Sequence, residues 1–395
     1  MPPLPSPKDA GTVIVGMSGG VDSAVAALLL QEAGFDVQGL FMSNWDDDDA
    51  YCTGATDFQD ARRVCEALSV PLHRVSFAAE YRERVFAHFL NEYAAGRTPN
   101  PDVLCNREIK FGVCLDYMHR LGASWIATGH YARVRRAGTT VRLLKAADTA
   151  KDQSYFLHQV APAALSRTLF PLGELRKDEV RRRAHAAGLA VYDKPDSTGI
   201  CFIGERPFEE FLSRYLTQAP GPIETPSGEV IGEHRGLALY TLGQRSGLRI
   251  GGRAGAAAAP WFVAAKQLER NALIVVQEQE HPLLVSDAFD VADIHWLQAP
   301  PPHDFECGVK TRYRQSDLPC RVDAGQVHAN QVRTDENSAH VVLATAARAV
   351  TPGQYAVFYD GDVCLGGGVI ARRYNSQLAH GKSDQEAAAP EGRGA

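Results

Sequence analysis

The sequence predicts an α/β protein with a doubly wound parallel sheet in its N-terminal part and an antiparallel β-barrel in its C-terminal part. Three observations support this prediction. Strand-like and helix-like segments alternate over residues 11–207, the next segment is rich in proline and glycine, and short strand-like runs broken by turns fill residues 281–374. Alternating strands and helices are typical of parallel βαβ units, whereas closely spaced short strands are typical of an antiparallel barrel or sandwich.

The first βαβ unit spans residues 11–42. Residues 11–16 (GTVIVG) are expected to form a buried strand, residues 24–34 a helix closed by a glycine, and residues 35–42 a second strand. The alternation continues with expected helices at 58–68, 81–95 and 111–121 and expected strands at 72–76 and 125–129. In such a sheet the ligand site lies at the carboxyl ends of the strands.

Changes in composition divide the chain. Near Phe208 proline and glycine become frequent and interrupt short β-like runs at 236–241 and 273–277. We therefore expect a disordered N-terminus (1–10), an α/β domain (11–207), a small central module of mixed α and β structure (208–280), a β-barrel (281–374) and a disordered tail (375–395). The expected barrel strands lie at 284–296, 307–314, 340–346, 354–359 and 362–372.

Bulk composition restricts the class of protein. With 395 residues, 45% of them hydrophobic and 22% charged, the chain is long enough for more than one folded domain. It has no signal-like N-terminus and no apolar run of about 18 residues, so a cytoplasmic protein is expected. Its eight cysteines form no CxxC pair, which argues against a disulfide framework and a zinc site. The net charge of -6 does not favour a nucleic-acid protein, but locally grouped arginines leave a basic face open.

Residues 16–23 (GMSGGVDS) lie where the first strand passes into the first helix. Backbone amides and the positive end of the helix dipole converge there, the adjacent glycines allow close approach, and the serine hydroxyls can donate, so an anion fits. The loop is neither a Walker A loop nor a GxGxxG dinucleotide loop, and a plain capped turn is the structural alternative. SGGVDS resembles the PP-loop of ATP pyrophosphatases, which have an adenine nucleotide alpha-hydrolase-like fold. The resemblance implies that ATP is cut between its α- and β-phosphates and that a carbonyl oxygen is adenylated.

Two cysteines lie in turn-rich, polar segments. Cys105 is flanked by prolines and by Arg107 and Lys110, which could lower its pKa, and Cys201 lies in KPDSTGICFIGER. Each fits an ordinary buried cysteine as well as a reactive thiol. Their spacing in the sequence does not bring them together.

Longer motifs carry a more specific resemblance. They are PNPDVLCNREIKFG, ATGHYAR, KDQSYFL, KPDSTGICFIGER, YTLGQRSGLRIGG and FYDGDVCLGGG, and with the PP-loop they span residues 11–373. In content and order they resemble bacterial tRNA-specific 2-thiouridylases, in which the β-barrel binds tRNA. Three positions depart from the common pattern: Ala24 replaces a frequent serine, and Ser43 and Ser246 replace lysines. The two missing lysines put the affinity for tRNA in doubt more than the chemistry.

The resemblance implies an enzyme that puts sulfur on C2 of uridine 34, the wobble position, in the tRNAs for Glu, Gln and Lys. ATP with Mg²⁺ would adenylate the C2 oxygen, so that AMP and pyrophosphate are released. A persulfide on Cys201 would deliver sulfur, and Cys105 would act as nucleophile and close a transient disulfide with Cys201. A sulfur-relay protein that carries a persulfide, or a cysteine desulfurase, would be the partner upstream.

The same matching assigns binding residues. Asp102 would be catalytic, because a carboxylate beside the uridine can take its N3 proton as a general base, although capping the helix that carries Cys105 is a compatible role. The residues that would contact ATP are Gly16, Met17, Ser18, Gly19, Gly20, Val21, Asp22, Ser23, Met42 and Gly129. The residues that would contact the target base are Asn100, Pro101 and Asp102, and those that would contact tRNA elsewhere are His130, Lys151, Asp152, Gln153, Arg312, Tyr313 and Gln354.

Three alternatives stay open at this point. A PP-loop amidating synthetase would use an amine in place of sulfur and would not need the two cysteines. A nonenzymatic RNA-binding protein would release no pyrophosphate. An iron-sulfur cluster on Asp102, Cys105 and Cys201 is a third alternative, which the absence of a CxxC pair disfavours.

Overall fold

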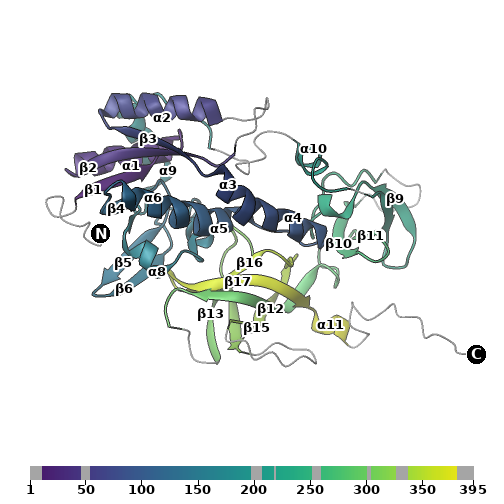
Figure 1. Ribbon diagram of the computed structural model, residues 1–395. Coiled ribbons are helices and arrows are strands. Elements are labelled where there is room, and N and C mark those ends of the chain that lie inside the picture. Colours follow the sequence, from purple (N-terminus) through teal and green to yellow (C-terminus); the bar gives the residue numbers. More distant parts are fainter. Residues whose placement is uncertain are drawn as a thin grey trace, which may run out of the picture.

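The computed structural model describes residues 11–45, 54–196, 207–217, 219–250, 259–299, 304–325 and 337–379. These residues form a parallel five-stranded sheet, a separate four-stranded sheet and an antiparallel barrel (Figure 1). The predicted fold class is therefore confirmed. Among the helices that the structure describes, none has the length and apolar character needed to cross a membrane.

The parallel sheet has the strand order β3-β2-β1-β4-β7. Its strands are β1 (Thr12–Gly16), β2 (Asp36–Ser43), β3 (Leu72–Ser76), β4 (Trp125–Ala127) and β7 (Thr168–Leu169). Side chains alternate across β1, so that Val13 and Val15 pack on one face and Ile14 on the other. The first face is covered by α1 (Val21–Glu32), α2 (Gly54–Leu68) and α9 (Lys177–Ala186). Both faces are thus buried, which explains the continuous apolar character of β1.

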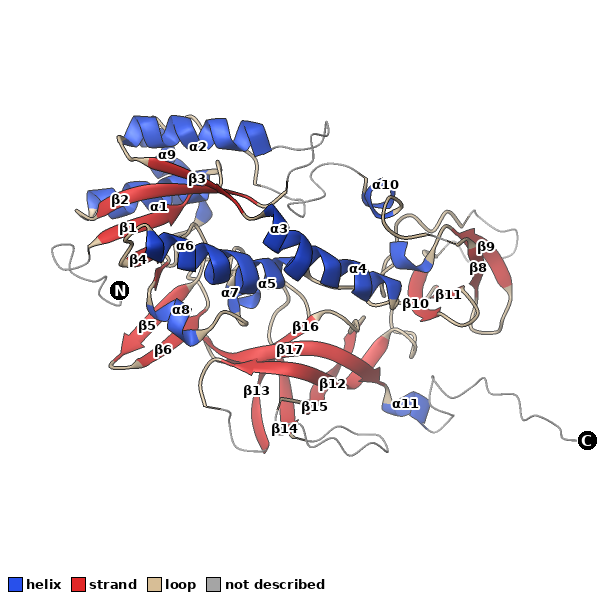
Figure 2. Cartoon of the chain, in the orientation of Figure 1, coloured by secondary structure: helices blue, strands red, loops and turns tan. Residues whose placement is uncertain are grey.

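The other face is covered by two consecutive helical segments, seen below the sheet in Figure 2. The first consists of α3 (Ala78–Tyr81), a π-helical stretch (Arg82–Phe86) and α4 (Ala87–Ala94). The second consists of α5 (Pro101–Leu104), a π-helical stretch (Cys105–Val113) and α6 (Cys114–Arg120). We expected the second helix to begin at residue 111, but it begins ten residues earlier. Pro101 occupies its first turn, where the missing N–H of proline has no cost.

A hairpin that the sequence did not reveal joins the α/β domain to the barrel. Strands β5 (Arg133–Ala137) and β6 (Thr140–Leu144) pair with each other, and Leu144 of β6 pairs with Val363 of the barrel. Charged residues at 133, 135 and 136 obscure the alternation of β5. The helices α7 (Ser154–Leu157) and α8 (Pro162–Ser166) follow the hairpin.

The central module contains α10 (Phe208–Leu212) and a sheet in the order β10-β11-β8-β9. Its strands are β8 (Gly221–Glu224), β9 (Val230–His234), β10 (Phe262–Gln267) and β11 (Ala272–Val276). The strand expected at 273–277 corresponds to β11, but the one expected at 236–241 was wrong. A 3-10 helix (Leu237–Leu239) lies there, because Gly236 turns the chain at a φ of 143° and Leu237 and Ala238 are both buried.

The C-terminal barrel closes through the pairing of its first and last strands, β12 and β17. Its strands are β12 (Val285–Trp296), β13 (Asp304–Lys310), β14 (Leu318–Ala324), β15 (Ala339–Arg348), β16 (Tyr355–Asp360) and β17 (Val363–Tyr374). Closure leaves no free edge between β12 and β17 and encloses an apolar core that includes Phe289, Val341 and Phe358. A short helix, α11 (Ser376–Ala379), begins the segment that we expected to be disordered.

Candidate active site

The loop between β1 and α1 presents the start of a helix with no side-chain cap. Gly20 is the N-cap residue, and its backbone is extended (φ -99°, ψ 167°). The Ser18 and Ser23 hydroxyl oxygens lie 3.2 Å apart, and Ser23 Oγ donates to the Gly20 carbonyl oxygen at 3.1 Å. The first amides of α1 have no acceptor in the preceding turn of a helix, so they and the two hydroxyls form a site for an anion.

Two glycines permit the close packing around this loop. Gly19 has a φ of 78°, and a Cβ there would lie 2.3 Å from the Asp57 carbonyl oxygen. Gly129 follows β4, and its Cβ would lie 2.7 Å from the Asp22 carbonyl carbon and from the Ser23 nitrogen. Met42, at the end of β2, packs beside Gly16. The structure therefore brings residues 16–23, Met42 and Gly129 together at the carboxyl ends of β1, β2 and β4.

Ion pairs surround the loop. Lys177 Nζ lies 2.8 Å from both carboxylate oxygens of Asp22 and 2.7 Å from Asp196 Oδ1. Lys194 Nζ donates to the Gly19 carbonyl oxygen at 3.0 Å. Burial opposes ionisation of Asp196, but hydrogen bonds from Lys151 and Lys177 lower its pKa to about 2. Sequence reasoning missed Lys177, Lys194 and Asp196 as neighbours of the loop. Their only signal was that Lys194 and Asp196 lie in the motif that contains Cys201.

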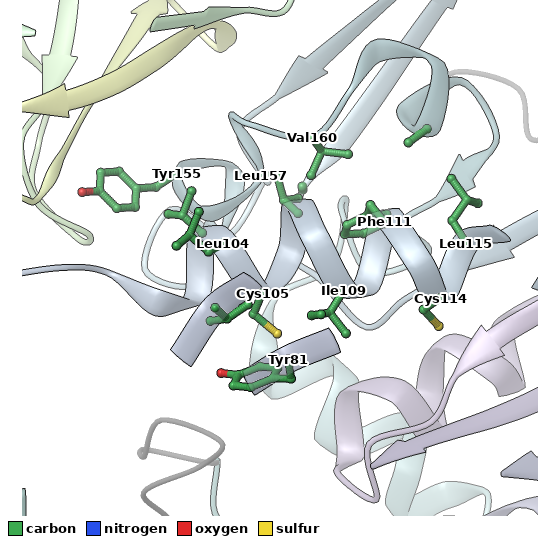
Figure 3. Close-up of a cluster of buried hydrophobic side chains, with 14 of the residues drawn as sticks. Tyr81, Leu104, Cys105, Ile109, Phe111, Cys114, Leu115, Tyr155, Leu157 and Val160 are labelled. Atoms are coloured by element: carbon green, nitrogen blue, oxygen red, sulfur yellow. The ribbon is translucent and has the colours of Figure 1, made fainter. Parts of the chain in front are cut away.

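The second part of the site is the segment that carries Cys105. Asn100 precedes the helix with an extended backbone and no side-chain cap, and Asp102 lies exposed in the first turn. Cys105 is only 2% exposed and belongs to the same apolar cluster as Tyr81 and Ile109 (Figure 3). In this conformation the thiol is therefore shielded from solvent.

Asp102 and His130 share a charged neighbour. Burial raises the pKa of the Asp102 carboxyl, although its side chain remains accessible, and the positive charge of Lys110 opposes the rise. Burial also lowers the pKa of His130 well below its usual value, and Lys110 adds to the effect. The His130 Nδ1 lies 2.8 Å from Thr128 Oγ1. An accessible carboxyl with a raised pKa suits proton transfer to and from a bound base.

The residues expected to contact tRNA differ in how free their side chains are. Gln354 Nε2 donates to the carbonyl oxygens of Thr98 and Pro99 at 2.8 and 3.2 Å, so the barrel holds the loop that leads to Asn100. Arg312 Nη2 donates to the Leu242 and Ala349 carbonyl oxygens and to Thr351 Oγ1, which ties the central module to the barrel. The Tyr313 ring lies 4.4 Å from the Phe156 ring.

Residues 151–153 are also engaged within the protein. Lys151 Nζ lies 2.6 Å from Asp196 Oδ2. Asp152 is 4% exposed and accepts hydrogen bonds from the Ala146 and Ser154 amides. Gln153 Oε1 accepts from the Tyr131 amide at 2.9 Å. These contacts give the segment a fixed shape, and Lys151 is the one of the three with a charged side chain partly open to solvent.

We expect Arg312→Ala to destabilise the fold more than Arg314→Ala. The first change removes three hydrogen bonds to oxygens of two domains, which costs roughly 2–4 kcal/mol of unfolding free energy. Arg314 is exposed and stacks beside Tyr313, so its loss should cost less than about 1 kcal/mol. Urea unfolding of both variants measures the difference. Equal unfolding midpoints would show that the Arg312 contacts contribute nothing to stability.

Cys201 lies outside the described residues. Within the described ranges no three His, Cys, Asp or Glu side chains are grouped so that they could hold a metal ion. Asp102 and Cys105 are thus found on one helix, without a described third ligand.

The fold and the loop define a nucleotide-binding enzyme of the HUP-domain class. Residues 11–205 match the family model described as tRNA methyl transferase HUP domain, residues 209–277 the tRNA methyl transferase PRC-barrel domain, and residues 286–370 the aminomethyltransferase beta-barrel domain.

Curated relatives specify the family. The tRNA-specific 2-thiouridylase MnmA of Chromohalobacter salexigens is 56% identical over 374 residues, which cover 94% of this chain and 95% of the relative. That of Bordetella avium is 56% identical over 371 residues, which cover 91% of this chain and 98% of the relative. The chain belongs to the tRNA-specific 2-thiouridylase family. Among solved structures, NMN synthetase from Francisella tularensis aligns with 54% of this chain and 81% of its own at 17% identity and a TM-score of 0.32.

Proposed function

We propose that this 2-thiouridylase replaces the C2 oxygen of uridine 34 by sulfur in the tRNAs for Glu, Gln and Lys. The observation that carries the proposal is the pairing of an uncapped helix start at residues 18–23 with a cysteine-bearing helix that starts from the loop held by Gln354. The first feature supports adenylation and the second supports sulfur chemistry.

ATP activates the oxygen. The amides at the start of α1 and the Ser18 and Ser23 hydroxyls hold the pyrophosphate part of ATP, while Gly129 and Met42 border the nucleotide. The C2 oxygen attacks the α-phosphorus, the bond to the β-phosphate breaks, and pyrophosphate leaves. Mg²⁺ bound with ATP would neutralise phosphate charge, and Asp22, whose carboxylate oxygens contact Lys177, would be the residue of this loop that holds it.

Sulfur then replaces the activated oxygen. The terminal sulfur of a persulfide on Cys201 attacks C2 and AMP leaves, which joins the base to Cys201 through a disulfide. The Cys105 thiolate attacks the Cys201 sulfur, so that 2-thiouridine is released and a Cys105–Cys201 disulfide remains. An external thiol reductant restores both cysteines, and a persulfide-carrying relay protein or a desulfurase reloads Cys201. The burial of Cys105 in the described conformation protects it from unspecific oxidation until the substrate docks.

The docking of tRNA involves more than one domain. We divide the chain into an α/β domain (11–207), a central module (208–280) and a barrel (281–374). The loop before Asn100 lies where the α/β domain contacts the barrel. A base stacked in the anticodon must be turned outward to reach Asp102, and Asn100 and Pro101 would line its position. His130, Lys151, Asp152, Gln153, Arg312, Tyr313 and Gln354 would shape the surrounding tRNA surface.

The loss of thiolation rate at low pH should follow the protonation of the Asp102 carboxyl. Its pKa is raised above the usual range by burial, so the protonated form, which is inactive as a base, persists to higher pH. Thiolation at saturating ATP should therefore fall as the pH drops through that raised pKa and recover above it. In Asp102→Asn, the rate should fall at least tenfold and the acid limb should vanish. If the rate of Asp102→Asn still fell at low pH as in the wild type, the fall would belong to a different titrating group.

One experiment tests the proposed function. The protein is incubated with unmodified tRNA, ATP, Mg²⁺ and a persulfide source, and the nucleosides are analysed by mass spectrometry. We expect 2-thiouridine and an equal amount of AMP, and no 2-thiouridine in the absence of ATP. An amidating synthetase would incorporate an amine, and a nonenzymatic RNA-binding protein would release no pyrophosphate. Visible absorption by anaerobically purified protein would indicate an iron-sulfur cluster in place of a persulfide.

A further inference from the structure

Two cysteines that the thiolation chemistry does not use lie side by side in the barrel. Cys307 on β13 and Cys320 on β14 are directly paired across the antiparallel ladder. Their sulfur atoms lie 3.7 Å apart, and both are free thiols. A hydrogen bond with Cys320, followed by burial, raises the pKa of Cys307, as expected where one thiol donates to the other.

The strand register already satisfies the backbone requirement of a disulfide. Directly opposed residues of an antiparallel pair have Cα atoms about 4.5–5.5 Å apart, within the range of about 4.4–6.8 Å found in disulfides. Small rotations of the two side chains can therefore bring the sulfur atoms into bonding distance without a shift of either strand. Neither Cys65 nor Cys114, each buried in a core of the α/β domain, has such a described partner.

The pair is open to a small reagent. Cys307 is partly exposed and Cys320 is 5% exposed. Both line a surface cavity of about 490 Å³, which is also bordered by Glu306, Arg321 and Val342. A linear disulfide of low molecular weight can approach the sulfur of Cys307 through this cavity.

We propose that Cys307 and Cys320 form a second thiol site, which low-molecular-weight disulfides such as glutathione disulfide oxidise to an intramolecular disulfide. At alkaline pH the pair loses one proton, and the thiol that keeps its proton donates a hydrogen bond to the thiolate. This thiolate attacks one sulfur of glutathione disulfide, which forms a mixed disulfide and releases one glutathione thiol. The remaining thiol of the pair then attacks the cysteine sulfur that carries glutathione, and the second glutathione thiol leaves. Two protein thiols are oxidised and one glutathione disulfide is reduced to two thiols, so electrons and protons balance.

The position of the pair gives the modification a consequence. The disulfide would link the two strands of the β13–β14 hairpin, whose turn carries Arg312, Tyr313 and Arg314. The strand pair nearest to this turn is Val309 with Leu318, and Cys307 with Cys320 lies two residue pairs further from the turn. Cross-linking at this point restricts opening of the β13–β14 hairpin. Amide hydrogen exchange between residues 308 and 319 should therefore slow on oxidation.

The test uses the full chain without tRNA or ATP, so its outcome is independent of the proposed function. Reduced protein is equilibrated with glutathione disulfide at mildly alkaline pH, remaining thiols are alkylated, and peptides are mapped by mass spectrometry. We expect a linked Cys307–Cys320 peptide pair that dithiothreitol separates. If both thiols are alkylated to the extent seen in fully reduced protein, or if either links to a different cysteine, the proposal is wrong.

A variant traps the intermediate. In Cys320→Ser the second attack cannot occur, so Cys307 should retain one glutathione as a mixed disulfide. Cys307→Ser is the matched variant, and the less exposed Cys320 should then acquire glutathione at least tenfold more slowly. Equal rates in the two variants would contradict access of the reagent through the cavity to the more exposed Cys307. Because wild-type mapping stands on its own, a variant that fails to fold leaves the proposal testable.

Discussion

Replacing Cys105 by serine abolishes the formation of 2-thiouridine while the protein still folds and binds ATP. The serine hydroxyl takes the place of a thiol that is 2% exposed, so packing changes little. A hydroxyl does not attack the Cys201 sulfur at neutral pH, so the product stays attached to the enzyme. We expect the turnover rate to fall roughly a thousandfold or more, as for loss of a covalent nucleophile in general. Nucleoside mass spectrometry measures the loss, and ATP binding by calorimetry shows the retained fold.

Cys114 provides the matched control. It starts α6, directly after the π-helical stretch that Cys105 begins, and it is also buried, so its replacement disturbs a comparable environment. Burial raises the pKa of Cys114 to about 12, which leaves it protonated and unreactive. Cys114→Ala should therefore cost some stability and leave the turnover rate within about twofold. Equal loss of turnover in both variants would mean that Cys105 serves packing and not chemistry.

The sequence predicted those parts of the fold that depend on neighbouring residues. The strand at 72–76 and the order of the first βαβ unit follow from local apolar patterns, and the structure has them there. The hairpin at 133–144 was missed because its stability comes from pairing with Val363, more than 200 residues away. The π-helical stretch at 105–113 was also missed, since no local pattern distinguishes a π-helix from an α-helix.

In the site, too, the features formed by neighbouring residues could be predicted, and those formed by residues distant in the sequence could not. The glycines and serines of the PP-loop could be recognised because the loop is contiguous in the sequence. Lys177 could not, because it reaches Asp22 from a helix 155 residues further along the chain. The family resemblance alone led us to expect Arg312 to contact tRNA. Only its hydrogen bonds to Leu242 and Ala349 reveal that it joins two domains.

Gly129→Ala should reduce kcat/KM for ATP by roughly a hundredfold. The new methyl group would lie 2.7 Å from two backbone atoms, the Asp22 carbonyl carbon and the Ser23 nitrogen, and backbone cannot rotate away as a side chain does. The first turn of α1 must therefore move, and with it the backbone amides that we propose hold the phosphates of ATP. A displacement of about 1 Å at reacting groups is enough for a loss of this size. Steady-state kinetics with varied ATP measures it.

A second glycine separates this effect from a general intolerance of alanine. At Gly232, in β9, a Cβ would lie 3.5 Å from the Ile223 side chain, an ordinary contact, and like Gly129 this glycine has no left-handed backbone. Gly232→Ala should therefore retain wild-type ATP kinetics. If Gly129→Ala also keeps the wild-type kcat/KM for ATP, and circular dichroism shows an unchanged fold, then the use of ATP does not depend on the packing of α1 against the end of β4. A selective loss in Gly129→Ala would instead support our proposal that the phosphates of ATP bind at this contact, because the added methyl group would displace the amides at the start of α1.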